Sequence, residues 1–284
     1  MPSSVPLKFN FNLLIGLSQA FSTMSGQSQS GSFKIVFARH GESEWTKNNW
    51  FCGWYDAPLS EKGLEEAHSS AKVLKDCGYT FDIAFTSLLT RARHTLDIIL
   101  SDIGQPDLPV VAHWRLNERH YGDLTGYNKE EMAAKYGLEQ LQIWRRKFDV
   151  LPPPMDENHK YYSSIVNNPK LKSQPDIEFP KVESLETTMV RCLPFWNEKV
   201  VPEILSGKRV LLVTHGTTLR GIVKHLDGLS DDAIMKLNLP TGMPFYYTLD
   251  DKLKPIISMK FFSDRETVEK AMALVASISH KLPD

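Results

Sequence analysis

Residues 33–41, with the sequence FKIVFARHG, point to the fold class of the whole chain. The short apolar run FKIVFA is typical of a strand in the centre of a sheet, and it ends at Arg39, directly before His40. Residues 208–216, KRVLLVTHG, form the most hydrophobic candidate strand and end at His215, where a helix is predicted to begin. Two candidate strands therefore each end in a histidine that is followed by a glycine.

Outward from these two segments, candidate strands alternate with amphipathic helices. Helices are predicted at residues 59–78, 88–104, 128–137, 183–205, 217–226 and 265–280, and further strands at 81–87, 109–114 and 244–249. Ser60 is the expected N-cap of the first helix, Asn128 and Glu131 resemble a capping box, and Pro194 implies a kink. Residues 152–181 are loop-like.

The alternation of strand and helix predicts the fold class. We expect an α/β domain with three layers, in which helices cover both faces of a mostly parallel central sheet. In such sheets, ligands bind beyond the carboxyl ends of the strands. The two histidines are predicted to lie at that edge.

Composition limits the classes of function. The chain has 284 residues, with 33 basic and 34 acidic side chains and a net charge of −1. This balance excludes a dedicated binder of nucleic acid or anionic membranes, and no run of about 18 uncharged apolar residues could span a bilayer. Cys52, Cys77 and Cys192 are far apart and form no C-x-x-C pair, so we expect neither a disulfide framework nor a zinc site. A reduced, cytoplasmic location follows.

Residues 1–32 differ in composition from the rest of the chain. They hold one lysine, no acidic residue and many Ser, Gln and Asn residues, and two asparagines interrupt their short apolar patch at 9–17. They match neither a secretory signal nor an arginine-rich mitochondrial presequence. We expect a flexible extension, with Met24 as an alternative start, followed by a catalytic domain over 33–284 whose helical tail begins at about residue 264.

The segment ARHGESEW, residues 38–45, holds the first candidate catalytic group. His40 at a strand end is held on a fixed backbone, Arg39 offers a planar fork for phosphate oxygens, and Gly41 permits a tight turn or a close backbone approach. A lone histidine is more often a packing residue. The combination Arg-His-Gly-Glu is far more restrictive and favours a phosphate site.

The segment HGTTLRG, residues 215–221, repeats this arrangement. Gly216 and Thr217 begin a helix whose free N–H groups and positive dipole end can hold an anion. Alone, this segment also fits a plain helix start capped by threonine. Paired with His40, His215 suggests that two histidines flank one phosphorus atom, one attacking it and the other stabilising its charge.

The segment WRLNERHYG, residues 114–122, supplies the third group of candidates. Glu118 is a candidate general acid and base, with Arg119 and Tyr121 as phosphate contacts. An Arg–Glu pair that stabilises a loop is the alternative for this segment. The other candidates are cations that also fit solvated helix surfaces: Arg91, Lys129, Arg145 and Arg146.

Seven motifs together resemble one family. They are RHGESEW, FTSLLTRARHT, WRLNERHYG, IWRRKFDVLPPPM, LPFWNEKVVPEI, RGIVKHLDGLS and NLPTGMP, and they resemble the cofactor-dependent phosphoglycerate mutases of the histidine phosphatase superfamily. The resemblance spans about Phe33 to Thr267 and is strongest to the animal-type phosphoglycerate and bisphosphoglycerate mutases. It implies that 3-phosphoglycerate and 2-phosphoglycerate are interconverted through a phosphohistidine primed by 2,3-bisphosphoglycerate, without a metal.

The resemblance also implies a role for each matching residue. His40 would be the phosphorylated nucleophile, Glu118 the proton donor and acceptor, and His215 the group that stabilises the transferring phosphoryl, with Arg39 and Arg91 beside it. The substrate-binding set would comprise Ser43, Thr46, Cys52, Gly53, Arg91, Arg119, Tyr121, Lys129, Arg145, Arg146, Gly216 and Thr217. The implied partners are small phosphoglycerates, and a homodimer is the oligomer considered.

Four departures from the family pattern bear on this assignment. Thr46 and Thr217 stand where asparagine is usual, Cys52 stands where a small hydroxyl residue is usual, and the tail ends in ASISHKLPD, which puts capping of the site in doubt. Gly53 matches the mutase branch, whereas the branch that synthesises bisphosphoglycerate carries serine. The alternatives are a bisphosphoglycerate mutase or phosphatase, or a binding protein on this fold that has lost turnover.

Overall fold

A six-stranded sheet lies at the centre of the computed structural model, which describes residues 32–277. The strands are β1 (Phe33–Arg39), β2 (Ile83–Thr86), β3 (Val110–Ala112), β4 (Val210–Thr214), β5 (Phe245–Leu249) and β6 (Pro255–Phe261). Their order across the sheet is β3-β2-β4-β1-β5-β6; the first four run parallel, and β5 runs antiparallel to both β1 and β6. The predicted extension lies outside the described residues, apart from Ser32.

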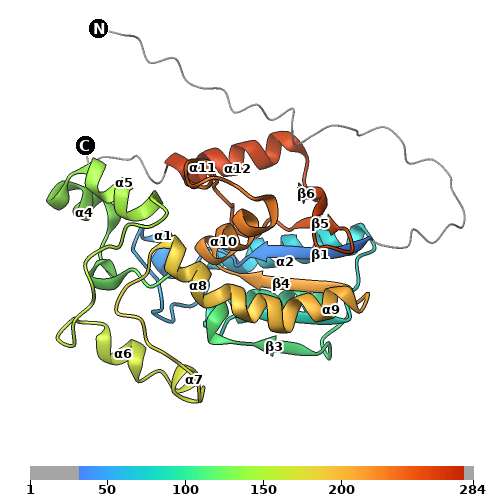
Figure 1. Cartoon of the computed structure of the whole chain (residues 1–284), viewed down its shortest axis with the longest axis horizontal. Coiled ribbons are helices and arrows are strands. Elements are labelled where there is room, and N and C mark those ends of the chain that lie inside the picture. The colour runs from blue at the N-terminus through green and yellow to red at the C-terminus, as the bar shows by residue number, and fades with distance from the viewer. Residues whose placement is uncertain (1–31, 278–284) are drawn as a thin grey trace, which may run out of the picture.

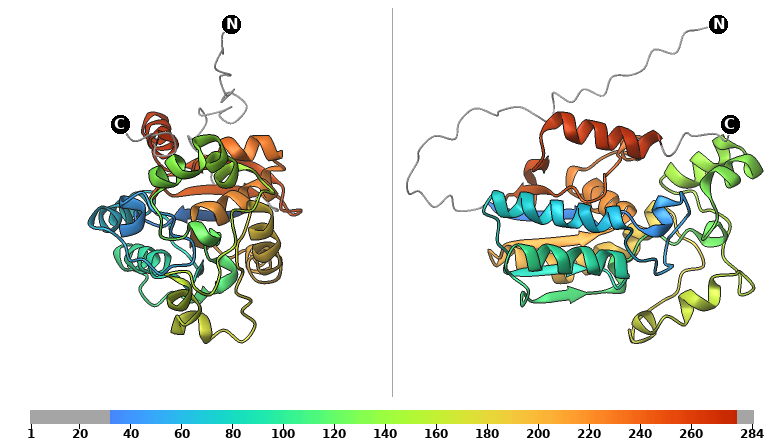
Figure 2. Two further views of the ribbon diagram at one scale, coloured as in Figure 1. Left: turned by 90° about the vertical axis from the view of Figure 1, so that its left-hand side faces the viewer. Right: turned by 180° about the vertical axis from the view of Figure 1, so that it is seen from behind.

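Helices cover both faces of this sheet (Figures 1 and 2). They are α1 (Glu44–Lys47), α2 (Glu61–Asp76), α3 (Thr90–Asp102), α4 (Lys129–Tyr136), α5 (Leu138–Arg146), α6 (Tyr162–Val166), α7 (Pro169–Lys172), α8 (Leu185–Phe195), α9 (Val201–Leu205), α10 (Gly216–Asp227), α11 (Asp231–Lys236) and α12 (Arg265–Ser277). Helices α2 and α3 cover one face, and α8, α9 and α10 cover the other. The predicted three-layer α/β fold is confirmed.

Side chains of the central strands alternate between two apolar cores. On β1, Val36 packs with Leu74 of α2 on one face, while Phe37 packs with Trp196 and Leu219 on the other. Every residue of β4 is buried. A strand that is covered on both faces reads as a continuous apolar run, because neither side chain direction meets water. This is the pattern that identified β1 and β4 in the sequence.

The register of the two central strands determines where their histidines lie. Strands β1 and β4 pair in parallel with Arg39 opposite Thr214, and the backbone N–H of His40 donates to the Thr214 carbonyl at 2.9 Å. His40 and His215 therefore leave the same edge of the sheet from neighbouring strands. Helices α4 to α7 lie beyond this edge, at the left of Figure 1.

Two of the predicted helix starts are capped as expected. The Ser60 hydroxyl accepts from the backbone N–H of Gly63 at the start of α2. The Asn128 side chain accepts from the N–H groups of Glu130 and Glu131 at the start of α4, which is a one-way cap in place of the reciprocal capping box. Each cap satisfies N–H groups that lack a partner within the helix.

The region predicted as one helix over 183–205 is interrupted. Helix α8 ends at Phe195, a π-helical turn spans Trp196–Val200, and α9 follows. Pro194 has no N–H to continue the α-helical pattern, and the predicted kink takes the form of this wider turn. The stretch 152–181 contains α6 and α7, which the sequence did not indicate, and α5, α11 and the edge strand β6 were also missed. Within residues 32–277, every helix is too short or too polar to cross a membrane.

Candidate active site

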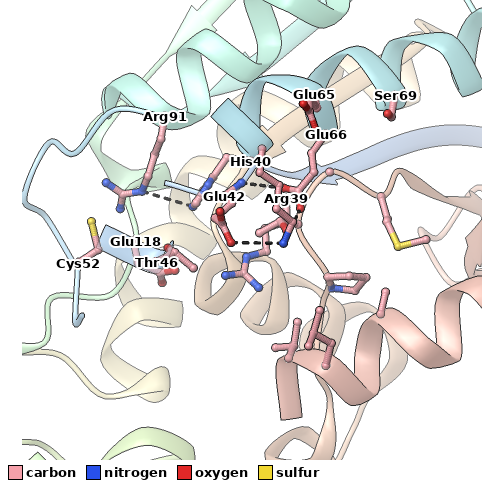
Figure 3. A pocket seen from close by; sticks show the side chains of 18 of the residues that line it. Arg39, His40, Glu42, Thr46, Cys52, Glu65, Glu66, Ser69, Arg91 and Glu118 are labelled. Atoms are coloured by element: carbon pink, nitrogen blue, oxygen red, sulfur yellow. Dashed lines mark hydrogen bonds and ion pairs between the residues drawn. The ribbon is translucent and has the colours of Figure 1, made fainter. Parts of the chain in front are cut away.

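A cavity of about 580 Å³ opens at the carboxyl ends of the parallel strands. Ten of the predicted site residues line it: Arg39, His40, Thr46, Cys52, Gly53, Arg91, Glu118, Tyr121, Lys129 and Arg145. A smaller cavity of about 90 Å³ shares several of these residues and adds Arg146, Gly216 and Thr217. Figure 3 shows Arg91, Cys52, Thr46 and Glu118 on one side of the larger cavity and Glu65, Glu66 and Ser69 on the other.

His40 is oriented as a nucleophile. Its Nδ1 lies 2.6 Å from the carbonyl oxygen of Gly41. A carbonyl can only accept a hydrogen bond, so Nδ1 carries the proton and Nε2 holds the lone pair. Burial, followed by the charges of Arg91 and Arg39, holds the pKa of His40 well below its usual value. The ring is therefore neutral, and Nε2 is the atom that can attack phosphorus.

The Arg91 guanidinium lies beside Nε2 of His40. Its Nε donates to His40 Nε2 at 3.3 Å, while its two terminal nitrogens donate to the carbonyls of Tyr55 at 2.9 Å and Gly53 at 2.7 Å. The side chain is almost completely buried. A guanidinium placed beside the nucleophile can stabilise the charge on equatorial phosphate oxygens.

Arg39 lies on the opposite side of the nucleophile, against the start of α10. It donates to the Leu239 carbonyl at 2.6 Å, and its buried Nε has no hydrogen-bond partner in the described residues. A Cβ atom at Gly216 would lie 3.2 Å from that Nε. A side chain at position 216 would therefore press on the Arg39 guanidinium, which lies against the N-terminus of α10, where the positive end of the helix dipole attracts an anion.

The structure explains the glycine at position 41 by close packing against α2, and not by the predicted approach of the backbone to phosphate. A Cβ atom at Gly41 would collide with the carbonyl of Gly63, and one at Gly63 would collide with the carbonyl of Glu42. The turn that follows His40 therefore packs backbone to backbone on the start of α2. The two glycines fix the position of His40 by close packing.

His215 completes the pair of histidines. Its ring centroid lies 4.9 Å from that of His40, at an interplanar angle of 65°. Its Nε2 lies 2.7 Å from the Ser87 hydroxyl, and its buried Nδ1 has no partner in the described residues. Burial, then the charge of Arg91, holds the pKa of His215 well below its usual value, so this ring is also neutral.

Backbone N–H groups hold the carboxylate of Glu118. Its Oε1 accepts from Arg119 at 2.8 Å and from Thr217 at 3.2 Å, and its Oε2 lies 3.4 Å from the Thr217 nitrogen. His215 is the N-cap residue of α10, and its own side chain makes no capping hydrogen bond, so the Glu118 carboxylate takes that place at the first turn of the helix. Thr217 therefore contributes its backbone N–H, which an asparagine at this position would also provide.

A buried ion pair fixes the segment that carries Glu118, and the sequence did not reveal it. Arg191 on α8 pairs with Glu183 at 2.6 Å and donates to the carbonyls of Asn117 at 3.1 Å and Glu118 at 3.2 Å. The hydroxyl of Thr218 also donates to the Asn117 carbonyl, at 2.7 Å. In the sequence, Arg191 is a single charge in a helix, which does not differ from a solvated surface residue.

Further cations line the two cavities: Lys129 and Arg145 line the larger one, and Arg145 and Arg220 line the smaller one. Lys129 donates to the side chain of Asn49 at 3.2 Å and to the Trp50 carbonyl at 3.4 Å. Burial, then the charge of Arg145, lowers the pKa of Lys129 to about 7. Burial also lowers the pKa of Arg145 to about 10 and that of Arg220 to about 9. Arg220 was not among the site residues predicted from the sequence. An anion bound among these groups would stabilise their charged forms.

Two of the remaining predicted residues, Ser43 and Arg119, lie outside the lining of the cavities. Ser43 is buried, caps α1 and bonds the Thr46 hydroxyl at 2.9 Å, and neither Ser43 nor Arg119 lines the cavity in this structure. The Arg119 guanidinium lies 4.5 Å from the centre of the Tyr121 ring. Burial raises the pKa of the half-buried Cys52 thiol. Substrate contacts of Ser43 and Arg119 stay predictions.

The C-terminal helix borders the site. Thr267, Ala271, Leu274 and Val275 of α12 line the larger cavity, so the described part of the tail forms part of its wall. Residues 278–284, which hold most of the atypical ending, lie outside the described residues. In the described part of the chain, no group of three His, Cys, Asp or Glu side chains is arranged to hold a metal ion.

Lys129 gives the site a predicted pH dependence. Its lowered pKa means that the protein loses this positive charge as the pH rises through about 7 when no anion is bound. A bound anion stabilises the ammonium form, so binding takes up a proton, and log Kd for an anion should rise with pH above 7 with a slope of up to about 1. The measurement is Kd for 3-phosphoglycerate, used as a probe anion, from pH 6 to 9 in the wild type and in Lys129→Met. The variant should bind more weakly and lose this rise; an unchanged profile in Lys129→Met would assign the titration to another group.

Comparison with known proteins places this geometry in a family. The model of the histidine phosphatase superfamily (branch 1) matches residues 35–165 and 155–250. Phosphoglycerate mutase from Bacillus anthracis is 20% identical, with a TM-score of 0.59 over 88% of this chain and 98% of that chain. Alpha-ribazole phosphatase from Shigella flexneri is 20% identical, with a TM-score of 0.59 over 82% and 96%. A mycobacterial glucosyl-3-phosphoglycerate phosphatase is 22% identical, with a TM-score of 0.59 over 81% and 96%. At these identities, the solved structures show a shared fold.

Proposed function

Because the chain belongs to the histidine phosphatase superfamily (branch 1), we propose that it is a 2,3-bisphosphoglycerate-dependent phosphoglycerate mutase. The observation that carries the proposal is the division of the cations into two groups. Arg91 donates to His40 and the charge of Arg39 acts on the same ring, whereas Lys129 and Arg145 line the same cavity and act on each other. Transfer of one phosphoryl group needs only the first group. The second group suits a substrate that carries a further phosphate or a carboxylate, as phosphoglycerates do.

The first half of the proposed reaction transfers a phosphoryl group to the protein. 2,3-Bisphosphoglycerate supplies that group. Nε2 of His40 forms the new bond to phosphorus, and the bond between phosphorus and the substrate oxygen breaks. Glu118, in its protonated form, gives its proton to the departing oxygen. Arg39, Arg91 and His215 meet the charge that develops on the equatorial oxygens.

The second half reverses these steps on 3-phosphoglycerate. Glu118 takes the proton of the 2-hydroxyl, whose oxygen bonds to phosphorus while the bond to His40 breaks, and this step leaves 2,3-bisphosphoglycerate bound beside free His40 and protonated Glu118. The 3-phosphoryl group of this bisphosphate then passes to His40 by the first half-reaction, which releases 2-phosphoglycerate and restores phosphohistidine. Because a neutral imidazole needs no separate base, the low pKa of His40 fits this cycle.

A phosphatase is the second candidate function. It is favoured by the size of the cavity and by its second side, where Glu65, Glu66 and Ser69 leave room for a group larger than phosphoglycerate. In that reaction, Glu118 would activate water in place of a substrate hydroxyl. A bisphosphoglycerate mutase on the same site, and a protein that binds phosphoglycerates without turnover, complete the alternatives.

One assay separates these functions. Formation of 2-phosphoglycerate is followed with coupled enolase, with and without 2,3-bisphosphoglycerate, while phosphate release and bisphosphoglycerate synthesis are measured on the same preparation. A mutase should require 2,3-bisphosphoglycerate, and its mutase rate should greatly exceed the other two. A predominant phosphate release would assign the phosphatase, a synthase rate at or above the mutase rate would assign the bisphosphoglycerate mutase, and tight binding without turnover would assign the binding protein.

Replacement of Gly53 with serine should lower mutase activity through the neighbouring backbone. Gly53 has a φ of +51°, and a Cβ atom there would lie 3.2 Å from the Arg119 oxygen and 3.3 Å from the Tyr121 nitrogen. The added atom would therefore press on the segment that carries Arg119 and Tyr121 and would not fill the cavity. We expect a several-fold loss of mutase turnover and a loss of stability of about 1 kcal/mol from the left-handed backbone.

Gly53→Ala is the matched control, because it adds the Cβ atom without the hydroxyl. Both variants should lose similar stability in denaturant titrations and similar mutase turnover. If alanine is tolerated while serine shifts the enzyme towards bisphosphoglycerate synthesis, the hydroxyl acts directly on the substrate and the packing explanation is wrong.

A further inference from the structure

Ser87 follows β2 at the edge of the sheet from which both histidines emerge. Thr86 pairs with Val213 of β4, so Ser87 lies beside the end of that strand. The residue is fully buried, and its hydroxyl lies 2.7 Å from Nε2 of His215. Neither the motifs nor the family resemblance gave Ser87 a role. Its contact with His215 joins residues 128 positions apart in the chain.

The hydrogen bonds around this hydroxyl indicate where its proton goes. Oγ of Ser87 accepts from the backbone N–H of Leu89 at 3.2 Å, which occupies one of its two lone pairs. A serine hydroxyl has a single proton to donate. The acceptor that the structure places within reach of that proton is Nε2 of His215.

The other ring nitrogen of His215 has no partner. Nδ1 is buried without a hydrogen bond in the described residues, and the ring lies against that of His40. Burial and the neighbouring arginines keep this imidazole neutral, so it carries one proton only. If Nε2 accepts from Ser87, Nδ1 carries that proton as a buried donor. In the other tautomer, the Nδ1 lone pair would face the oxygens of a phosphoryl group on His40 and would repel them.

We propose that Ser87 is a positioning residue that selects the Nδ1–H tautomer of His215, so that this group donates a hydrogen bond to the transferring phosphoryl group. The inference rests on phosphoryl transfer at His40, which is part of the proposed function, and not on the choice between mutase and phosphatase. A backbone contact at Leu89 and a side-chain contact at His215 together orient the hydroxyl, much as an outer partner orients a catalytic histidine elsewhere.

The kinetic test uses Ser87→Ala, with Thr86→Val as the matched control. Thr86 is also fully buried, and its hydroxyl has no hydrogen-bond partner in the described part of the chain. With p-nitrophenyl phosphate as substrate, Ser87→Ala should lower kcat/KM several-fold, with an upper limit on the order of 10²-fold that corresponds to complete loss of one donor to the transition state. Thr86→Val should retain the wild-type value.

A double-mutant cycle shows whether Ser87 acts through His215. Ser87→Ala should lose most of its effect when introduced into His215→Ala, because the ring that it orients is then absent. An equal loss in both backgrounds would overturn the proposal and assign Ser87 a role independent of His215. Melting temperatures of all four proteins check that each variant is folded.

The tautomer itself is measured without substrate. Two-dimensional NMR of protein with ¹⁵N-labelled histidine should show His215 as the Nδ1–H tautomer in the wild type and a mixture of tautomers in Ser87→Ala. A wild-type Nε2–H tautomer would overturn the proposal even if the enzyme is active. The tautomer result stands by itself if the protein lacks mutase activity, so a failure of the proposed function is distinguishable from a failure of this inference.

Discussion

Replacement of His40 with alanine should abolish the covalent phosphoryl adduct and lower turnover on the order of 10⁴-fold or more, as the loss of a catalytic nucleophile does. Three features of the structure lead to this expectation. Nδ1 is tied to the Gly41 carbonyl, the pKa of the ring is held well below its usual value, and Arg91 lies beside Nε2. The lone pair of Nε2 faces the Arg91 guanidinium, and the charge of Arg39 also acts on this ring.

Which ring nitrogen of His40 carries the phosphoryl group tests the orientation of the ring more sharply than the mere formation of an adduct. Because Nδ1 carries the ring proton, the phosphoryl group should be attached to Nε2. Incubation with ³²P-labelled 2,3-bisphosphoglycerate should give an acid-labile, base-stable adduct, and ³¹P NMR against standards of both phosphohistidine isomers identifies the nitrogen. His94→Ala, which removes an exposed histidine of α3, should leave the adduct unchanged. An Nδ1 adduct, or an undiminished adduct in His40→Ala, would contradict this mechanism.

The position of the two histidines could be predicted from the sequence because it depends on strand pattern alone. Apolar runs that end in His40 and His215 indicate central strands of a parallel sheet, whose carboxyl ends share one edge. The register of Arg39 opposite Thr214 then places the rings 4.9 Å apart at their centroids. Long periodic helices such as α2 and α3 were recognised for the same reason, since their signal extends over many residues.

The supporting contacts could not be predicted, because each joins segments far apart in the chain. Ser87 and Arg191 are an ordinary serine and an ordinary helix charge until the fold places them beside His215 and the carbonyl of Glu118. Helices α6 and α7 have five and four residues, too few for a periodic pattern, although Asn168 and the proline after it are a typical helix start. The edge strand β6 is only partly buried, so its apolar pattern is weak.

The distribution of charge would allow this nearly neutral chain to bind the polyanionic substrate that we propose. The net charge is −1, yet cations from β1, α3, α4, α5 and α10 converge on one edge of the sheet. Burial lowers the pKa of Arg39, Lys129 and Arg220, which means that their surroundings in the protein destabilise their charged forms. Binding of an anion relieves this destabilisation. The positive charge of the site is therefore local: it would complement a bound anion, although the chain as a whole is nearly neutral.

Replacement of Glu118 with glutamine should separate proton transfer from phosphoryl transfer. The amide oxygen can still accept from the N–H groups of Arg119 and Thr217, so the side chain should keep its position. It cannot give or take a proton, however, and turnover of 3-phosphoglycerate should fall roughly 10²- to 10⁴-fold, the usual contribution of a general acid and base. Phosphorylation of His40 by p-nitrophenyl phosphate should fall much less, because nitrophenolate leaves without being protonated.

The contrast between the two substrates is what assigns the role to Glu118. If the carboxylate only stabilised the backbone of the segment that Arg191 fixes, Glu118→Gln would slow both substrates alike. Glu65→Gln is the matched control, since Glu65 is an exposed carboxylate that lines the same cavity, and both rates should match the wild type there. Rapid-quench measurement of His40 phosphorylation with each substrate gives the two rates directly. Equal losses in Glu118→Gln would exclude Glu118 as the proton donor and transfer that role to another group of the cavity.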